Sequence, residues 1–264
     1  MPRSVPVVLS IAGSDSGGGA GIQADLKAFA RCGVHGTTAI TAITAQSTVA
    51  VEAVEPVAPE MIRAQIRAVA ADLGVDAVKI GMVGGSEAIA AVAAALDELE
   101  PRIPVVLDPV MIAESGGRLL PQDAEDALRT QLLPRSAVVT PNLGEARVLA
   151  RMGDDASAED LARAIHDLGP AVVIVTGGHR DEATDVLFDG RQVVELPGDR
   201  HPDGAAHGSG CTHSSVLAAR LALGDDPVQA ARAARQIASE AVRDGLRELG
   251  SGAGPVNVLG LGRP

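Results

Sequence analysis

The sequence contains no tryptophan and no tyrosine, and Phe29 and Phe188 are its two phenylalanines. A flat ligand would therefore lie against aliphatic or sulfur-containing side chains instead of an aromatic cage. Lysine is equally scarce, since only Lys27 and Lys79 are present. Neither lysine follows a Gly-x-x-x-x-Gly pattern, which excludes a Walker-type phosphate loop.

Cysteine and long apolar runs are also scarce. The two cysteines, Cys32 and Cys211, form neither a disulfide framework nor a metal-ligand spacing, which fits a reducing compartment. No apolar run approaches the roughly 20 residues of a membrane-spanning helix, and residues 1–6 lack the apolar core of a signal peptide. We therefore expect a cytoplasmic protein that does not contact the membrane.

Charge and size narrow the class of ligand. The 264 residues carry a formal net charge of −12, whereas nucleic-acid binding relies on clustered Lys and Arg. We therefore expect a small-molecule ligand and no nucleic-acid partner. A hydrophobic content of 46% is sufficient for a substantial core, and no linker or repeat interrupts the chain. Residues 1–264 are expected to form a single domain.

Short β-branched runs alternate along the chain with longer Ala-rich helical patterns. Strands are predicted at residues 5–12, 35–44, 76–80, 103–107, 137–140 and 171–176. Helices are predicted at residues 21–30, 59–73, 86–99 and 123–132, twice within 144–168, and at 211–223 and 227–246. Such alternation is typical of an α/β fold with three α-β-α layers and a mostly parallel central sheet. The runs at residues 184–188 and 191–196 predict an antiparallel hairpin at the sheet edge.

The segment Gly208-Ser209-Gly210-Cys211-Thr212 precedes an apolar helical run. A Gly-x-Gly turn that opens into a helix directs backbone N–H groups and the positive end of the helix dipole at one spot, where an anion can bind. Cys211 lies at that spot, and its thiol is expected to ionise more readily there, which makes it a candidate base. The alternative is a buried structural cysteine beside an ordinary turn.

Polar and glycine-rich segments follow the predicted parallel strands. In an open parallel sheet, ligands bind outside the carboxyl ends of the strands, so these segments are expected to form one site. They are residues 13–21, Gln46, and residues 81–82, 108–111, 142–145 and 177–179.

These motifs, in their order along the chain, resemble those of the hydroxymethylpyrimidine/phosphomethylpyrimidine kinases of thiamine biosynthesis. The matching segments are residues 12–15, 18–27, 44–48, 79–82, 107–111, 140–146 and 207–212. The resemblance runs nearly end to end and implies the ribokinase-like fold. It also implies ATP-dependent phosphorylation of 4-amino-5-hydroxymethyl-2-methylpyrimidine, followed by phosphorylation of the monophosphate to the diphosphate. ATP and Mg²⁺ are the implied cofactors, and we expect a homodimer.

The resemblance places the pyrimidine beside Gln46, whose amide offers one acceptor and two donors to a ring nitrogen and the adjacent amine. Met82 and Val110 resemble the family's apolar contacts to the ring. The other implied substrate-binding positions are Gly13, Ala20 and Asp25.

Asn142 and Glu145 resemble the magnesium and phosphate motif of ribokinase-like enzymes. Mg²⁺ needs few carboxylates when nucleotide phosphates are present, so Glu145 is expected to bind the metal, with Asp108 as the second acidic candidate. The implied ATP-binding positions are Asn142, Thr176, Gly178, Gly208 and Ser209.

The implied catalytic residues are Cys211, Gly208 and Gly210. Most ribokinase-like kinases carry an Asp as the base at the position of Cys211, whereas the pyrimidine kinases carry a Cys. The backbone N–H groups of residues 208–211 would stabilise the charge on the transferring phosphoryl group.

The chain departs from the family pattern at several positions. Thr176 stands where family members often carry a Lys that is thought to contact the ATP phosphates, and Arg180 is one candidate for the missing charge. Ser209 replaces the usual Thr. His213 replaces the usual Leu and is interpretable as an exposed helix residue.

Two alternatives remain open. A pyridoxal or pyridoxine kinase shares the fold and the cysteine-type loop, although Gln46 favours the pyrimidine. A non-catalytic protein that binds a vitamin precursor is the alternative of another class, but it does not explain why Asn142, Glu145 and Cys211 occur together.

Overall fold

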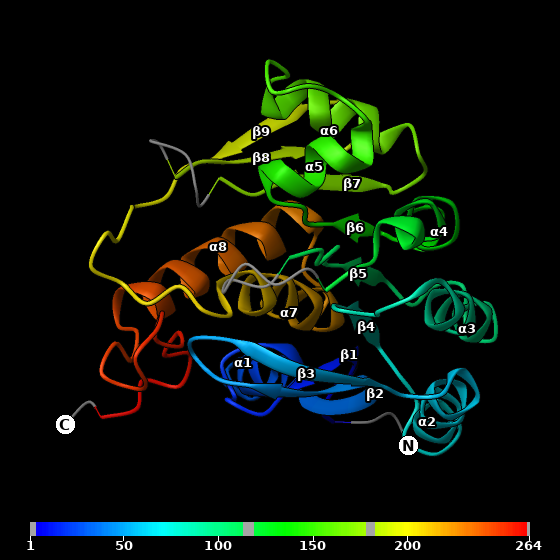
Figure 1. Cartoon of the computed structure of the whole chain (residues 1–264). Helices are drawn as coiled ribbons and strands as arrows, with labels where there is room; N and C mark the ends of the chain where they lie inside the picture. Colours follow the sequence, from blue (N-terminus) through cyan, green and yellow to red (C-terminus); the bar gives the residue numbers. More distant parts are fainter. Residues whose placement is uncertain (1–3, 113–118, 178–182, 263–264) are drawn as a thin grey trace.

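The computed structural model describes residues 4–112, 119–177 and 183–262. Within these residues, a nine-stranded sheet has the order β3-β2-β1-β4-β5-β6-β7-β8-β9 (Figure 1). The strands are β1 (Val7–Asp15), β2 (His35–Gln46), β3 (Val51–Pro56), β4 (Ala77–Ile80), β5 (Val105–Leu107), β6 (Val138–Val139), β7 (Val172–Val175), β8 (Asp185–Phe188) and β9 (Val193–Leu196). The pairs from β2 to β7 are parallel, and the pairs that involve β3, β8 or β9 are antiparallel.

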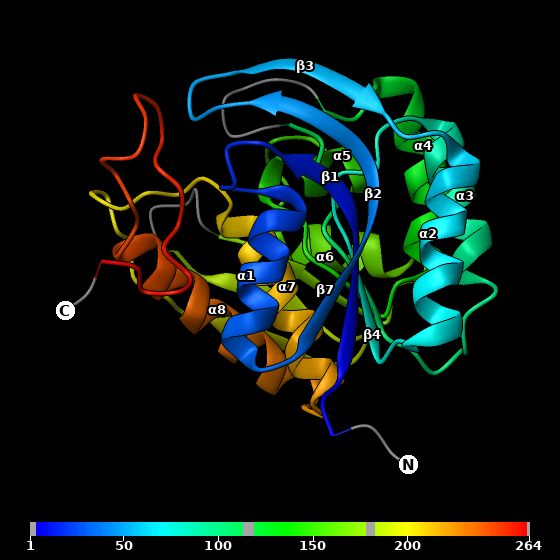
Figure 2. The same ribbon diagram turned by 90° about the horizontal axis from the view of Figure 1, so that it is seen from below.

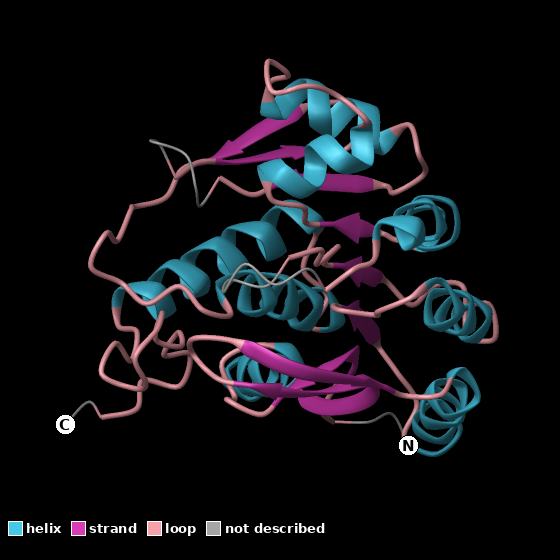
Figure 3. Ribbon diagram, in the orientation of Figure 1, coloured by secondary structure: helices cyan, strands magenta, loops and turns pink. Residues whose placement is uncertain are grey.

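Helices cover both faces of this sheet (Figures 1 and 2), and the strands form the middle layer in Figure 3. On one face, α1, α7 and α8 bury Phe29 and Leu217 against the strands. On the other face, α2 to α6 bury Ile66, Val92 and Leu161. The helices are α1 (Gly21–Cys32), α2 (Pro59–Asp72), α3 (Ser86–Leu96), α4 (Glu125–Ala127), α5 (Leu143–Ala150), α6 (Ala158–His166), α7 (Ser209–Ala222) and α8 (Pro227–Arg243). In the described part of the chain, no helix is long and apolar enough to cross a membrane.

The central strands are short apolar runs because helices cover both of their faces. Strands β4 to β7 are buried along their whole length. Strand β1 contains an irregularity near its end, where its register with β2 shifts between Ala12 and Ser14. A Cβ atom on Gly13 would lie 2.4 Å from Cε of Met82, which follows β4, so glycine leaves room for the end of this side chain.

The α/β alternation, the three layers and the antiparallel edge hairpin are confirmed. The hairpin is formed by β8 and β9, and β8 also pairs with β7 in the antiparallel sense. Strand β3 was not predicted. It pairs with β2 at the opposite edge, and its residues are exposed apart from the half-buried Val51, so it lacks the apolar face by which a strand is recognised.

The continuous helix predicted at residues 123–132 is wrong. This segment contains a 3₁₀ turn (Gln122–Ala124), the single α-turn α4 and a π-turn (Leu128–Leu132). Ala124, Leu128 and Leu132 are spaced by four residues and are all buried. Positions four residues apart also share one face of a regular α-helix, so the apolar spacing alone does not distinguish that helix from the turns found here.

Candidate active site

A cavity of about 450 Å³ lies at the carboxyl ends of the parallel strands. Its wall combines residues from the strand ends with the N-terminus of α7. The residues predicted for the site that line it are Gly13, Ala20, Gln46, Met82, Asp108, Val110, Asn142, Glu145, Thr176, Gly208, Ser209, Gly210 and Cys211. Gly178, predicted to bind ATP, and Arg180 lie outside the described residues.

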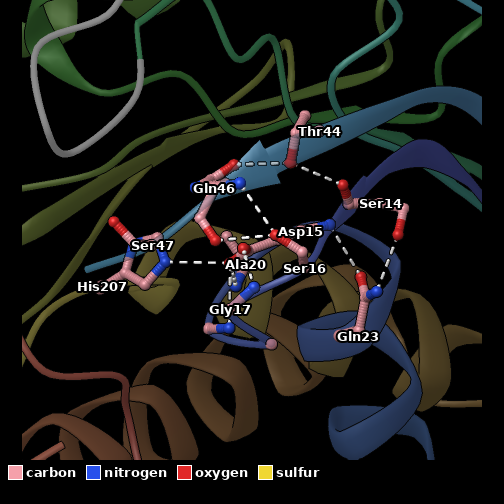
Figure 4. A network of polar contacts seen from close by, with 12 residues as sticks. Ser14, Asp15, Ser16, Gly17, Ala20, Gln23, Thr44, Gln46, Ser47 and His207 are labelled. Atoms are coloured by element: carbon pink, nitrogen blue, oxygen red, sulfur yellow. Dashed lines mark hydrogen bonds and ion pairs between the residues drawn. The ribbon is translucent and has the colours of Figure 1, made fainter. Parts of the chain in front are cut away.

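Gln46 is held at the end of β2 by its neighbours (Figure 4). Its Oε1 accepts a hydrogen bond from Oγ1 of Thr44 at 3.2 Å. Its backbone N donates to Oγ of Ser16, and the same hydroxyl donates to the Gln46 carbonyl, each at 2.8 Å. Within the described residues, nothing accepts a hydrogen bond from the Gln46 side-chain amide nitrogen. This donor is therefore available to a ligand in the cavity.

The first turn of α7 presents backbone donors to the same cavity. Gly208 has a φ of 85°, and no side chain caps the helix that begins at Ser209. The Ser209 N–H donates to the Ala206 carbonyl, whereas the N–H groups of Gly210 and Cys211 have no acceptor among the described residues. These donors and the helix dipole form an anion-binding position.

The thiol of Cys211 does not behave as the sequence predicted. Burial raises its pKa to about 12, although the nearby Lys79 ammonium acts in the opposite direction. The expectation of an easily ionised thiol is therefore wrong for this structure. The helix dipole favours the thiolate, but desolvation of the half-buried thiol outweighs it, and the nearby carboxylates of Asp108 and Asp25 raise the pKa further.

Two carboxylates, Asp108 and Glu145, line the cavity and are almost fully buried. Burial, and then the charge of Asp108, raises the pKa of Glu145 to about 8. Burial also raises the pKa of Asp108. Oε2 of Glu145 accepts from the Asn142 backbone N at 3.0 Å, and Oδ1 of Asn142 accepts from the Glu145 N at 3.0 Å, which caps α5. A divalent cation between these two carboxylates would relieve their mutual repulsion.

The protein alone provides too few ligands for a closed metal site. The described ranges contain no group of three or more His, Cys, Asp or Glu side chains that could hold a metal ion. Mg²⁺ usually keeps several waters and takes one or two carboxylates together with substrate phosphates. Asp108 and Glu145 therefore suit Mg²⁺ that arrives with a nucleotide.

Asp25, predicted to bind the substrate, lies beneath the cavity instead. It is fully buried and is absent from the cavity wall. Its carboxylate is 2.8 Å from Nζ of Lys79 and accepts hydrogen bonds from Ser10 at 2.5 Å and Ser215 at 2.7 Å. The sequence pattern placed Asp25 in the right segment, but its side chain points into the polar core under the site.

Several cavity residues were not predicted from the sequence. His213, interpreted as exposed, is 4% exposed, and its Nε2 is 3.5 Å from Asp185. Asp185 also accepts from the Gly177 N–H at 2.8 Å and lies 3.7 Å from the Arg235 guanidinium. This polar group borders Thr176 in the cavity wall. The signal that could have found it is the single histidine within a run of small residues at the start of α7.

The sheet, the helix N-terminus and the carboxylate pair define a small-molecule kinase of the ribokinase-like class. The chain belongs to the phosphomethylpyrimidine kinase family, whose model matches residues 15–257.

Relatives and solved structures agree with this assignment. The chain is 50% identical to the hydroxymethylpyrimidine/phosphomethylpyrimidine kinase of Rhizobium meliloti, over 95% of this chain and 96% of the relative. It is similar in structure to a phosphomethylpyrimidine kinase from Clostridium difficile, with a TM-score of 0.79 and 39% identity over 90% of this chain and 99% of that one. It is also similar to Bacillus subtilis pyridoxal kinase, solved as an ADP complex, with a TM-score of 0.88 and 37% identity over 98% and 99% of the two chains.

Proposed function

We propose that the chain transfers the γ-phosphoryl group of ATP to the hydroxymethyl group of 4-amino-5-hydroxymethyl-2-methylpyrimidine and then phosphorylates the resulting monophosphate. The observation that supports this proposal is the meeting of three elements in one cavity. Gln46 provides base recognition, the N-terminus of α7 provides an anion position, and Asp108 with Glu145 provides the cation position. The names of the relatives support the choice of substrate.

The pyrimidine half of the cavity is built for a flat ring with hydrogen-bonding edges. Gln46 pairs with the aminopyrimidine edge through its acceptor and its unused donor. Met82 and Val110 provide apolar contacts in a wall that has no aromatic ring of Phe, Tyr or Trp. The hydroxymethyl group then lies toward α7.

The phosphoryl half of the cavity stabilises charge instead of supplying covalent chemistry. The N–H groups of Gly210 and Cys211 donate to the transferring group, which passes through a loose transition state. Asp108 and Glu145 would hold Mg²⁺, which would neutralise phosphate charge when bound. The described wall contains no lysine, so with Thr176 at this position the positive charge comes from the cation, the helix dipole and the guanidinium groups of Arg200 and Arg235, which also line the cavity.

The test is ATP turnover with the hydroxymethylpyrimidine, its monophosphate, pyridoxal and pyridoxine, compared as kcat/KM. We expect both pyrimidines to be preferred. Gln46→Leu should weaken pyrimidine binding by about 1–3 kcal/mol, because buried ligand groups lose their partner, and should leave ATP affinity unchanged. The exposed Gln122→Leu is the matched control. A preference for pyridoxal would support pyridoxal kinase instead, which the likeness to solved pyridoxal kinases makes the second candidate.

The proposal extends to the assembly and to the location of the protein. A homodimer, a single domain over residues 1–264 and a cytoplasmic location stay predictions from the sequence. Light scattering of the full chain tests the first of these.

A further inference from the structure

Two glycine-rich segments from distant parts of the chain meet at Asp15. Its carboxylate is 2% exposed and lies at the end of β1. Oδ1 accepts from the Gly17 N–H at 2.8 Å, and Oδ2 accepts from the N–H groups of Gly19 at 3.0 Å and Ala20 at 2.8 Å (Figure 4). One side chain thus fixes the conformation of residues 15–20.

The same Oδ2 atom is 3.0 Å from Nε2 of His207, which directly precedes the anion position of α7. A carboxylate only accepts hydrogen bonds, so Nε2 of His207 carries the proton. Burial alone would raise the pKa of Asp15, but the hydrogen bonds from His207 and the backbone hold it below its ordinary value. Asp15 is therefore the ionised acceptor in this contact.

His207 is itself fixed from the opposite side by the C-terminal segment. Its N–H donates to the Gly254 carbonyl at 3.3 Å, and its carbonyl accepts from the Val256 N–H at 3.1 Å. His207 is 8% exposed and lines the cavity. The ring therefore projects from a backbone that is held in place.

The two segments also touch through their backbones. A Cβ atom on Gly208 would lie 1.8 Å from the Gly19 carbonyl oxygen, and a Cβ atom on Gly19 would lie 2.1 Å from Cδ2 of His207. This closeness requires glycine at both positions. Any displacement of residues 15–20 would therefore move the start of α7.

Residues 15–20 are linked to Gln46 as well. The hydroxyl of Ser16, next to Asp15, makes the two 2.8 Å hydrogen bonds with the backbone of Gln46. A single short segment thus contacts both the predicted base-reading residue and the backbone of Gly208.

We propose that Asp15 and His207 are positioning residues that hold Gln46 and the N–H groups at the start of α7 at a fixed separation. A pyrimidine bound to Gln46 then presents its hydroxymethyl oxygen to the transferring phosphoryl group without a further adjustment of either loop. The inference rests on the proposed function for its readout, because pyrimidine phosphorylation reports this separation. Misplacement of reacting groups by about 1 Å can cost roughly 100-fold in rate.

The experiment compares His207→Met with His207→Gln. Both side chains have a similar length, but only glutamine carries an N–H that can reach Asp15. We expect His207→Met to raise the pyrimidine KM, to lower kcat and to reduce kcat/KM by roughly 10- to 100-fold, and we expect His207→Gln to recover to within about threefold of the wild type. KM for ATP should change less than about threefold. The exposed His35, changed to Met and to Gln, provides the matched control.

The outcomes separate positioning from a general effect on folding. If His207→Met lowers only the melting temperature, or if His207→Gln falls as far as His207→Met, the proposal is overturned. If His207→Met does not fold, His207→Asn replaces it, because its amide is polar but too short to reach Asp15. Failure of the proposed function itself appears differently, as a wild-type chain that does not phosphorylate the pyrimidine at all.

A second measurement tests transmission through residues 15–20. Ser16→Ala removes the hydroxyl that holds the Gln46 backbone, and we expect it to raise the pyrimidine KM. When it is combined with His207→Met, the loss should be smaller than the product of the two single losses, since both changes release the same segment. Fully multiplicative losses would show that His207 does not act through this segment and would overturn the proposal.

Discussion

Two sets of buried carboxylates lie close together in this molecule, and their surroundings differ. Asp25 is fully buried and is matched by the Lys79 ammonium at 2.8 Å and by two serine hydroxyls. Asp108 and Glu145 line the cavity, and Nζ of Lys79 is 4.0 Å from Oδ2 of Asp108. The first set is matched by a cation at hydrogen-bond distance, whereas no side-chain cation among the described residues is that close to the second set.

The pKa values follow this difference. Burial alone would lower the pKa of Lys79, but the charge of Asp25 raises it above its ordinary value, so the ammonium keeps its charge. Burial raises the pKa of both Asp108 and Glu145, and the charge of Asp108 raises the pKa of Glu145 further. The comparison teaches that the Asp25–Lys79 pair belongs to the fold, and we expect the Asp108–Glu145 pair to be completed by a ligand.

The largest effect is expected from breaking the matched pair. Lys79→Met leaves the Asp25 carboxylate buried without a cation, and the free energy of unfolding should fall by about 3–5 kcal/mol. Urea denaturation measures this loss. The double variant Lys79→Met/Asp25→Asn removes both charges and should recover much of it. Equal stability of Lys79→Met and wild type would contradict the assignment of this pair to the fold.

Glu145→Gln removes one ionisable carboxyl group from the unmatched pair. At alkaline pH it should raise the free energy of unfolding, whereas Lys79→Met lowers it. Glu145→Gln should lower turnover by roughly 100-fold, a loss typical for removal of one charge-stabilising group. Its effect on stability depends on pH. Because the folded-state pKa of about 8 lies above the ordinary 4.5, the folded protein binds the extra proton, and wild-type stability decreases as the pH rises through about 8.

Thermal unfolding at pH 5 and pH 8.5 checks this sign. Glu145→Gln should be more stable relative to the wild type at the higher pH, and the exposed Glu87→Gln should show no such trend. A wild-type protein that gains stability between these pH values relative to Glu145→Gln would refute the raised pKa.

A third and smaller effect concerns the metal. A carboxyl group must lose its proton to bind Mg²⁺, so the apparent Mg²⁺ affinity should rise by about tenfold for each pH unit below about 8 and then level off. The measurement is the Mg²⁺ concentration for half-maximal activity between pH 6 and 9. In Glu145→Gln this dependence should flatten. An equally steep dependence in the variant would assign the titration to Asp108 or to another group.

Much of the fold could be predicted from the sequence, because buried parallel strands and amphipathic helices have distinct apolar periods. The failures have physical causes. Strand β3 has no buried face, so its pairing with β2 depends on backbone hydrogen bonds that leave no apolar pattern. The apolar spacing at residues 122–132 is compatible with a regular helix, and the pattern carries no signal for the 3₁₀ and π-turns found there.

The site was predictable only as a set of segments. Glycines and polar residues at strand ends indicated where Gln46 and Glu145 would meet, because strand ends converge in an open parallel sheet. The pairing of side chains was not predictable from local sequence. Asp15 and His207 are separated by 192 positions, and whether Asp25 faces the ligand or the core depends on Lys79 from another strand.

Cys211 gives the smallest effect and the sharpest test of the comparison, since both sets of carboxylates act on its thiol. With a pKa of about 12, the thiol stays protonated near neutral pH and is a poor proton acceptor. The hydroxymethyl substrate must lose a proton, whereas the monophosphate is already largely anionic, with a second pKa near ~6. A thiolate base would therefore matter far more in the first reaction.

We expect Cys211→Ala to slow the two reactions by factors that agree within about threefold, because both use the backbone donors of α7. Single-turnover rates at saturating ATP and Mg²⁺ measure these factors, with Cys32→Ala as the control. A first reaction slowed tenfold more than the second would show that the bound substrates restore the thiolate and that Cys211 removes the proton.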